Sequence, residues 1–310
     1  MNPDNSIGGV FVAAVTPHRE KTYEADVGAT LDLVDFLAAA GVNGIALLGS
    51  AGEFLHLAFE DRTRLVQMVV KRSRVPVLAG VAHSTLDGAV ELGRDAASAG
   101  AEGLLLMPPY FFRYSQEEIQ EFYLQFAAAL GGAARIFLYN IPAFTNEIAA
   151  ETAVSLLRTG LFAGIKDSGG QYGYFEQLLA ISQEKPLTLL IGNDRIYTRA
   201  RPRGAHGIVS GVACAVPELL VALDQAIAKN LPAQVERLDA RLQEFIAWHD
   251  QFPTPVVIKT AAHERGLKIG PLASPLGPAA QRRLEEFREW FRAWLPDVQR
   301  EAAEPLDRQY

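Results

Sequence analysis

The chain has 310 residues, of which 49% are hydrophobic, and a formal net charge of -7. This length suits one barrel-sized domain with an appendage, or two smaller domains. The acidic balance and the lack of any basic run argue against nucleic acid as a partner, because binding to a phosphate backbone needs clustered lysine and arginine.

Three features indicate a cytoplasmic protein. The single cysteine, Cys214, excludes an intrachain disulfide. The first residues, Met1-Asn2-Pro3-Asp4, lack the basic and apolar segments of a signal peptide. No apolar run approaches the roughly 20 residues needed to cross a bilayer, so we expect no membrane contact.

Short apolar runs alternate with amphipathic stretches up to about residue 230, the pattern of βα units on a parallel sheet. Eight such runs favour a closed barrel over an open sheet. The predicted fold class is therefore α/β, a (β/α)8 TIM barrel spanning residues 1–230. The predicted strands are Val10–Val15, Gly44–Leu48, Val75–Val81, Gly103–Met107, Ile136–Tyr139, Phe162–Lys166, Leu187–Ile191 and Gly207–Val209.

The helical patterns carry their own boundary signals. Ser115 and Glu118 form a predicted capping box, and Pro217 is predicted to open a helix. After about residue 230 only helical patterns remain, so residues 231–310 form a C-terminal helical extension that packs against the barrel or a second subunit. The polar tail from Glu301 to Tyr310 is predicted to fray.

Residues at the carboxyl ends of the strands are the candidates for chemistry, because barrels of this kind place their active sites there. Lys166 alone among the lysines closes a predicted interior strand. Burial of an unpaired ammonium favours the neutral amine, which can attack a ketone and form an imine that acts as an electron sink. Strand position alone does not decide between this role and a structural ion pair with a barrel carboxylate.

Tyr139 ends the neighbouring strand, so its hydroxyl is placed to transfer protons at an imine on Lys166. Taken alone, a strand-end tyrosine is more often a packing residue, but the pair with Lys166 favours the functional interpretation. The segment Gly49–Glu53 offers backbone N–H groups and the Ser50 hydroxyl to a carboxylate, with a plain tight turn as the alternative. Glu53 is interpreted as an acceptor that fixes this loop.

No metal site is predicted, because the six histidines form no closely spaced pair with a carboxylate. We expect no cofactor other than the covalent imine between substrate and Lys166. Cys214 is interpreted as a packing residue near the last strand, with a catalytic thiol as the alternative.

At these residues the chain resembles the dihydrodipicolinate synthase and N-acetylneuraminate lyase family of class I, Schiff-base aldolases and lyases. The resemblance covers the barrel and the extension, and its motifs occur in family order. They are Gly49-Ser50-Ala51-Gly52-Glu53, Tyr139-Asn140-Ile141-Pro142, Gly164-Ile165-Lys166-Asp167-Ser168, Gly192-Asn193-Asp194 and Gly204-Ala205-His206-Gly207-Ile208-Val209-Ser210-Gly211.

The resemblance implies that Lys166 forms the imine, that Tyr139 transfers protons, and that Ser50 with the backbone of Ala51 holds the carboxylate of pyruvate or another 2-oxo acid. It also implies that Gly192 and Val209 line the pyruvate pocket. The family is typically a homotetramer, a dimer of dimers. An aromatic residue of the strand-four loop, Tyr110 or Phe111, would cross into a neighbour's site.

Three departures from the dihydrodipicolinate synthase pattern bear on the substrate. Ser50-Ala51 replaces two threonines, Phe111 replaces a tyrosine, and Phe144 stands where an arginine would bind the aldehyde substrate's carboxylate. Ser168, beside the lysine strand, is assigned to a substrate hydroxyl or distal acid. The sequence therefore predicts a lyase for a 2-keto-3-deoxy sugar acid or 4-hydroxy-2-oxoglutarate, acting by retro-aldol cleavage or dehydration.

Three other functions remain open at this point. The first is a 4-hydroxy-tetrahydrodipicolinate (dihydrodipicolinate) synthase. The second is a barrel that binds a 2-oxo acid without turnover, which Ala51 and Phe111 motivate. The third is a divalent-metal aldolase, which has little support in the sequence.

Overall fold

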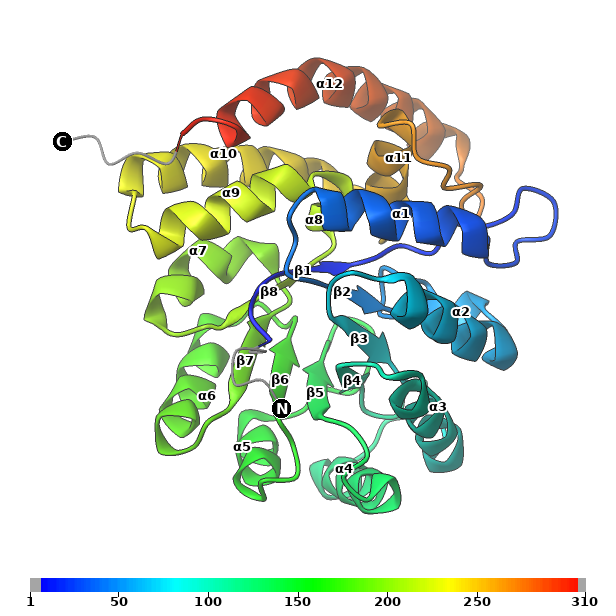
Figure 1. Cartoon of the computed structure of the whole chain (residues 1–310), viewed down its shortest axis with the longest axis vertical. Coiled ribbons are helices and arrows are strands. Elements are labelled where there is room, and N and C mark those ends of the chain that lie inside the picture. Colours follow the sequence, from blue (N-terminus) through cyan, green and yellow to red (C-terminus); the bar gives the residue numbers. More distant parts are fainter. Residues whose placement is uncertain (1–6, 306–310) are drawn as a thin grey trace.

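The computed structural model describes residues 7–305, and its eight strands close in chain order into one parallel barrel (Figure 1). The prediction of a (β/α)8 TIM barrel is confirmed, and each predicted strand overlaps an observed one. Met1-Asn2-Pro3-Asp4, on which the signal-peptide argument rests, lies outside the described residues. The strands are β1 (Gly9–Ala13), β2 (Gly44–Leu47), β3 (Val77–Gly80), β4 (Gly103–Leu106), β5 (Ile136–Asn140), β6 (Gly164–Asp167), β7 (Thr188–Ile191) and β8 (Gly207–Ser210).

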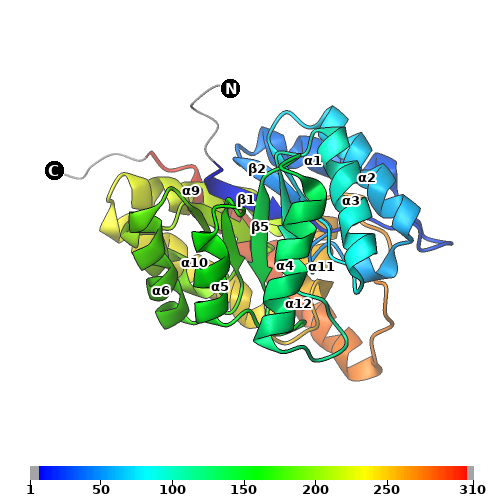
Figure 2. The ribbon, with the colours of Figure 1, turned by 90° about the horizontal axis from the view of Figure 1, so that it is seen from below.

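Helices run alongside the strands on the outside of the barrel, as α4, α5 and α6 do in Figure 2. The capping box of Ser115 and Glu118 forms at the start of α4, and Pro217 begins α9, as predicted. The barrel helices are α1 (Val27–Ala39), α2 (Phe59–Arg72), α3 (Leu86–Ala99), α4 (Gln116–Leu130), α5 (Ala150–Arg158), α6 (Tyr172–Glu184), α7 (Tyr197–Ala200), α8 (Val212–Ala215) and α9 (Pro217–Ala228), with 3-10 turns at Phe54–His56, Asp194–Ile196 and Arg201–Arg203.

The pairing of β5 with β6 places two predicted site residues side by side. Tyr139 is the register partner of Lys166. Register partners on neighbouring strands point to the same face of a sheet, because side chains alternate between the two faces. Gly164 allows β6 to lie close against β7, since a Cβ there would come within 2.0 Å of the Thr188 carbonyl oxygen. The sheet therefore brings both side chains to the same mouth of the barrel.

The extension consists of α10 (Pro232–His249), α11 (Val256–Glu264) and α12 (Pro278–Ala302), which lie together along one side of the barrel (Figure 1). An aromatic core joins α10 to α12, with Phe245 edge-on to Phe287 at a centroid distance of 6.1 Å. Arg265, after α11, pairs with Glu218 of α9 at 2.8 Å. The extension therefore packs against the barrel, which is one of the two arrangements predicted from the sequence.

The predicted fraying of the tail is wrong for its first residues. Residues 301 and 302 continue α12, and Glu301 accepts from Arg241 of α10 at 2.6 Å. The ion pair gives Glu301 a partner on α10, which the polar composition of the tail did not indicate. Residues 306–310 lie outside the described part of the chain.

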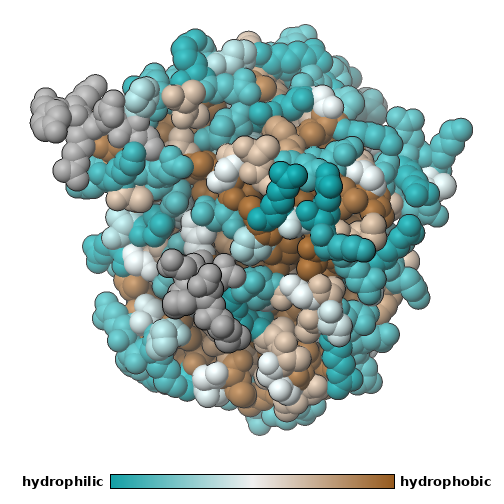
Figure 3. Space-filling model, viewed as in Figure 1, coloured by the Kyte–Doolittle hydropathy of each residue, from teal (hydrophilic) through white to brown (hydrophobic). Residues whose placement is uncertain are grey.

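The described surface shows no sign of a membrane span. None of the helices within residues 7–305 has the length and apolarity that crossing a bilayer requires. On the face shown in Figure 3 hydrophilic side chains predominate, and apolar ones gather in smaller areas between them. Scattered apolar atoms of this kind are ordinary on protein surfaces.

Candidate active site

Lys166 sits at the carboxyl end of β6 with 3% of its surface exposed. Its Nζ lies 3.8 Å from the centroid of the Tyr139 ring. Within residues 7–305, no carboxylate oxygen lies within ion-pair distance of this amine. The alternative of a structural ion pair is therefore not realised, and the amine is available to a ligand.

The Tyr139 hydroxyl lies 3.4 Å from Ser50 Oγ. Burial alone would raise the pKa of this phenol, but the charge of Lys166 and hydrogen bonds with Lys166, Ser50 and Ser168 outweigh it. The pKa of Tyr139 is consequently below its ordinary value. A phenol that gives up its proton more easily is suited to transfer protons at an adjacent imine.

The loop Gly49–Glu53 connects β2 to the first 3-10 turn and faces the same cavity. The backbone N–H groups of Ser50 and Ala51 donate to no protein acceptor among the described residues. Leu48 and Glu53, at the two ends of the loop, have left-handed backbones with φ of 57° and 52°. Free amides beside a hydroxyl can bind a carboxylate, so the structure offers here more than a plain tight turn.

A cavity of about 170 Å³ is lined by Lys166, Tyr139 and Ser50 of the Gly49–Glu53 loop. Gly192 keeps it open around the amine, because a Cβ there would come within 2.1 Å of Ser168 Oγ and 3.0 Å of Lys166 Cε. The lining residues anticipated from the sequence are Ser50, Ala51, Tyr139, Phe144, Lys166, Ser168, Gly192 and Val209.

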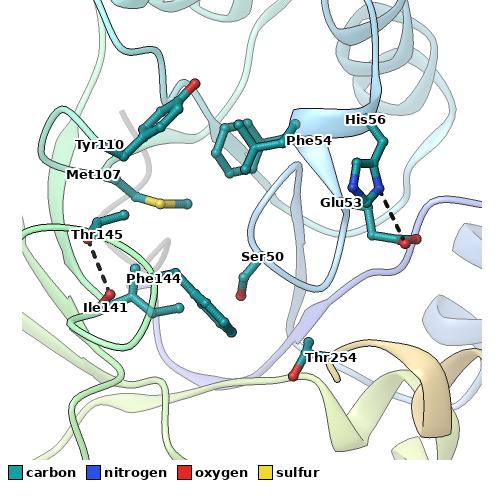
Figure 4. A pocket seen from close by; sticks show the side chains of 11 residues that line it. Ser50, Glu53, Phe54, His56, Met107, Tyr110, Ile141, Phe144, Thr145 and Thr254 are labelled. Atoms are coloured by element: carbon teal, nitrogen blue, oxygen red, sulfur yellow. Dashed lines mark hydrogen bonds and ion pairs between the residues drawn. The ribbon is translucent and has the colours of Figure 1, made fainter. Parts of the chain in front are cut away.

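A second hollow of about 250 Å³ opens beside the first and shares Ser50, Ile141, Phe144 and Thr254 with it. Figure 4 shows Tyr110 facing Phe54 across its upper side, with ring centroids 5.7 Å apart. Tyr110 therefore lines this outer hollow. Phe111 lines neither one, since its side chain is 88% exposed and packs against Phe112.

Among the cavity residues with no assigned role in the sequence analysis are Asp194 after β7, and His249, Thr254 and Ile258 from the extension. The Asp194 carboxylate accepts from Ser210. Burial raises the pKa of Asp194, partly offset by the Ser210 hydrogen bond and by the charges of His249 and Lys166. The Gly192-Asn193-Asp194 motif signalled Asp194, whereas no pattern in the sequence signals the residues from the extension.

A second buried lysine lies behind the carboxylate loop. Lys259 of α11 is 1% exposed and forms an ion pair with Glu53. Its Nζ is also 3.4 Å from Nδ1 of His18, which is buried. Glu53, interpreted from the sequence as an acceptor that fixes this loop, thus accepts from a partner that lies more than half the chain away.

The described His, Cys, Asp and Glu side chains also bear on metal binding and on a catalytic thiol. Within 7–305, no three His, Cys, Asp or Glu side chains are grouped so that they could hold a metal ion. Burial raises the pKa of Cys214 to about 11. Because the thiolate is the nucleophilic form, a buried thiol of this kind is unsuited to catalysis.

The chain resembles known proteins over most of its length. The model of the dihydrodipicolinate synthetase family matches residues 6–293. A 4-hydroxy-tetrahydrodipicolinate synthase of Methanothrix thermoacetophila is 29% identical over 282 residues, which are 91% of this chain and 95% of that protein. An uncharacterised DapA-like lyase of Halobacterium salinarum is 33% identical over 254 residues, 81% of this chain and 82% of its own.

Among solved structures, YagE of Escherichia coli K12, a prophage protein of the dihydrodipicolinic acid synthase family, is 26% identical with a TM-score of 0.85. The match covers 93% of this chain and 99% of that one, and that structure is a complex with pyruvate. The similarity therefore includes both the barrel and most of the extension.

Proposed function

Since the chain belongs to the dihydrodipicolinate synthetase family, whose members are lyases, we propose that it is a pyruvate-dependent lyase acting through an imine on Lys166. The single observation that carries the proposal is a buried amine that has no carboxylate partner in the described part of the chain and lies 3.8 Å from the centroid of the Tyr139 ring at the edge of a cavity. The pyruvate bound to the related YagE supports a 2-oxo acid as the ligand.

In the first half of the reaction, the neutral amine of Lys166 attacks the ketone carbon of the 2-oxo acid. The substrate carboxylate is held by Ser50 Oγ and the N–H of Ala51. Tyr139 supplies the proton that lets the carbinolamine oxygen leave as water, which yields the iminium ion. No redox partner or metal is needed for these steps.

In the second half, the iminium accepts the electron pair of the bond that breaks. For retro-aldol cleavage, the C4 hydroxyl gives its proton to Tyr139 as the C3–C4 bond breaks, leaving an aldehyde and an enamine. Protonation of C3 and hydrolysis of the imine release pyruvate and regenerate Lys166. For dehydration, C3 loses a proton and the C4 hydroxyl leaves as water, so both outcomes share one intermediate.

The charges around the cavity support a neutral, hydroxylated second half for the substrate. No arginine lines either hollow among the described residues, and the carboxylate of Asp194 lines the inner one. Asp194 and Ser168 suit hydroxyl groups, whereas a second carboxylate at this end would meet a negative charge. A 2-keto-3-deoxy sugar acid therefore fits better than 4-hydroxy-2-oxoglutarate.

A second candidate is 4-hydroxy-tetrahydrodipicolinate synthase, and the observation that favours it is the name carried by relatives such as the Methanothrix protein. Against it stands Phe144, which lines both hollows where that activity would need a cation for the aldehyde's carboxylate. A substrate panel separates the two, because each predicts a different product from pyruvate-containing mixtures.

The assembly and location that we propose follow the same resemblance. A homotetramer built from dimers would cover the apolar side chains exposed near the mouth of the barrel, which are Leu55, Phe111, Phe112 and Phe144. With one cysteine and an acidic surface, we propose that the enzyme works in the cytoplasm.

Borohydride reduction in the presence of pyruvate, followed by intact mass measurement, tests the proposal. We expect a single adduct on the wild-type chain and none on Lys166→Ala. An unmodified wild-type chain, or a Lys166→Ala variant that is still labelled, would reject the imine. Trapping without release of pyruvate from any 2-keto-3-deoxy acid would instead indicate a barrel that binds 2-oxo acids without turnover.

A further inference from the structure

The ion pair between Lys259 and Glu53 lies outside the proposed chemistry, yet it is among the most deeply buried charged contacts of the described residues. The side chains of Lys259 and Glu53 are 1% and 6% exposed. Burying two charges costs about as much solvation as their attraction returns, so such a pair contributes little net stability compared with apolar residues of the same volume. A role in holding a specific geometry accounts for it better.

Glu53 is the last residue of the carboxylate loop. Its backbone is left-handed, as is that of Leu48 just before the loop, and both conformations are unfavourable for residues with a side chain. Figure 4 shows Ser50 directed into the hollow, while the Glu53 carboxylate, at the edge of that hollow, points toward His56. The loop thus presents one side to the ligand and is anchored on the other.

Two contacts hold that anchored side besides Lys259. Thr16 donates to the Gly52 carbonyl oxygen at 2.7 Å, and His56 Nδ1 lies 3.6 Å from Glu53 Oε1. The His56 side chain is half exposed, which weakens its interaction with the carboxylate. Of the two described ion-pair partners of the Glu53 carboxylate, Lys259 is fully buried and His56 is not.

Lys259 also connects the loop to a part of the cavity wall that the extension supplies. It follows directly after Ile258, which lines the catalytic cavity, and both belong to α11 of the extension. We propose that Lys259 is a positioning residue that, through the Glu53 carboxylate, holds residues 49–53 in the conformation that presents Ser50 and Ala51 to the substrate carboxylate. The extension would then complete the 2-oxo acid site, an inference that rests on the proposed function of that site.

The test compares the double variant Glu53→Gln/Lys259→Met with the wild type, because removing both charges leaves no unpaired buried ion. The single variant Lys259→Met is expected to be much less stable, since it strands the carboxylate. Arg265→Met is the matched control, because it removes another ion pair of the extension, that with Glu218, which does not involve the carboxylate loop. All variants are made in the full chain.

Two measurements are made on each variant. Hydrogen exchange with mass spectrometry reports on the amides of residues 49–53 without any ligand, and borohydride trapping over a range of pyruvate concentrations gives the half-saturating concentration and the limiting rate. In the double variant we expect a melting temperature near that of the wild type and faster hydrogen exchange in the loop. The half-saturating pyruvate concentration should rise by about tenfold, which is the loss of affinity expected when one hydrogen bond to a charged group is removed. The limiting rate should change by less than about threefold, because Lys166 and Tyr139 are untouched.

Wild-type exchange in the loop of the double variant, or an unchanged half-saturating concentration, would overturn the positioning role. Equal effects in Arg265→Met would overturn it as well, because they would mark a general loosening of the extension. A wild-type chain that pyruvate does not label would refute the proposed function instead, and the exchange measurement would still decide whether Lys259 holds the loop.

Discussion

Replacing Tyr139 by phenylalanine removes one oxygen atom and leaves the ring against which Lys166 packs. The ring lies 3.8 Å from the amine and is almost fully buried, so the packing of Lys166 should be retained. Ser50, whose Oγ lies 3.4 Å from the lost hydroxyl, and Ser168 each lose a hydrogen-bond partner. The substitution therefore separates proton transfer from packing.

The expected loss follows from the size of general acid–base catalysis. A positioned proton-transfer group contributes about 10²- to 10⁴-fold, so kcat for release of pyruvate should fall by about 10³-fold, or about 4 kcal/mol of activation free energy. The free energy of unfolding should change by only about 1 kcal/mol, the worth of an ordinary hydrogen bond. Borohydride should still label Lys166, at a lower rate.

The assay is coupled detection of pyruvate from 2-keto-3-deoxy acids, with intact mass for the adduct. Tyr123→Phe is the control, because Tyr123 is also fully buried and donates to the Leu106 carbonyl oxygen at 2.8 Å, yet lines neither hollow. Turnover by Tyr139→Phe within about threefold of the wild type, or an equal loss in the control, would refute a proton-transfer role for Tyr139.

Three further outcomes are expected. Asp194→Asn should lower kcat/KM for hydroxylated 2-keto-3-deoxy acids by about 10- to 100-fold, because the hydrogen bond from the substrate hydroxyl to this side chain becomes weaker. Trapping of pyruvate by borohydride should stay unchanged, and a loss of trapping would contradict this prediction. Cys214→Ala should keep wild-type turnover, and in the wild type a thiol reagent at neutral pH should label Cys214 only after unfolding, because burial raises its pKa to about 11. Burial first, and then the charges of Lys259 and His56, lower the pKa of His18 from 6.5 to about 4. Between pH 6.5 and 4 the unfolded chain therefore binds a proton at His18 that the folded chain does not. The free energy of unfolding, measured in urea, should decrease as the pH falls through this range, by at most about 1.4 kcal/mol per pH unit for this group. A His18→Gln variant with the same slope would contradict the assignment.

The barrel and the centre of its site were predictable because both depend on local patterns. Apolar runs of strand length alternating with helical spacing identify βα units, and a parallel barrel collects the ends of its strands at one mouth. Lys166 and Tyr139 each end a strand, so their meeting followed from strand order alone. Ser50 was likewise predicted from its place after a strand, whereas Gly192 and Val209 were predicted from the family resemblance; all three line the cavity.

Residues of the extension were not predictable in this way. Helical spacing identified residues 231–310 as a helical extension, but spacing says only which side of a helix is apolar, not what that side packs against. His249, Thr254 and Ile258 consequently reach the cavity with no sequence signal. For the tail, the polar composition predicted fraying from Glu301 onward, but Glu301 forms an ion pair with Arg241 of α10.

The sequence by itself thus determined the barrel, the position of the Lys166 amine and the phenol beside it, because the periodicity of side chains along a strand is a local property. Only the tertiary structure decided that Lys166 has no carboxylate partner among residues 7–305 while Lys259 has one, that Phe111 lies outside the cavity, and that α11 forms part of the cavity wall. These features depend on contacts between residues far apart in the chain. Such contacts depend on how the helices pack against the barrel, and this packing cannot be predicted from a short stretch of sequence.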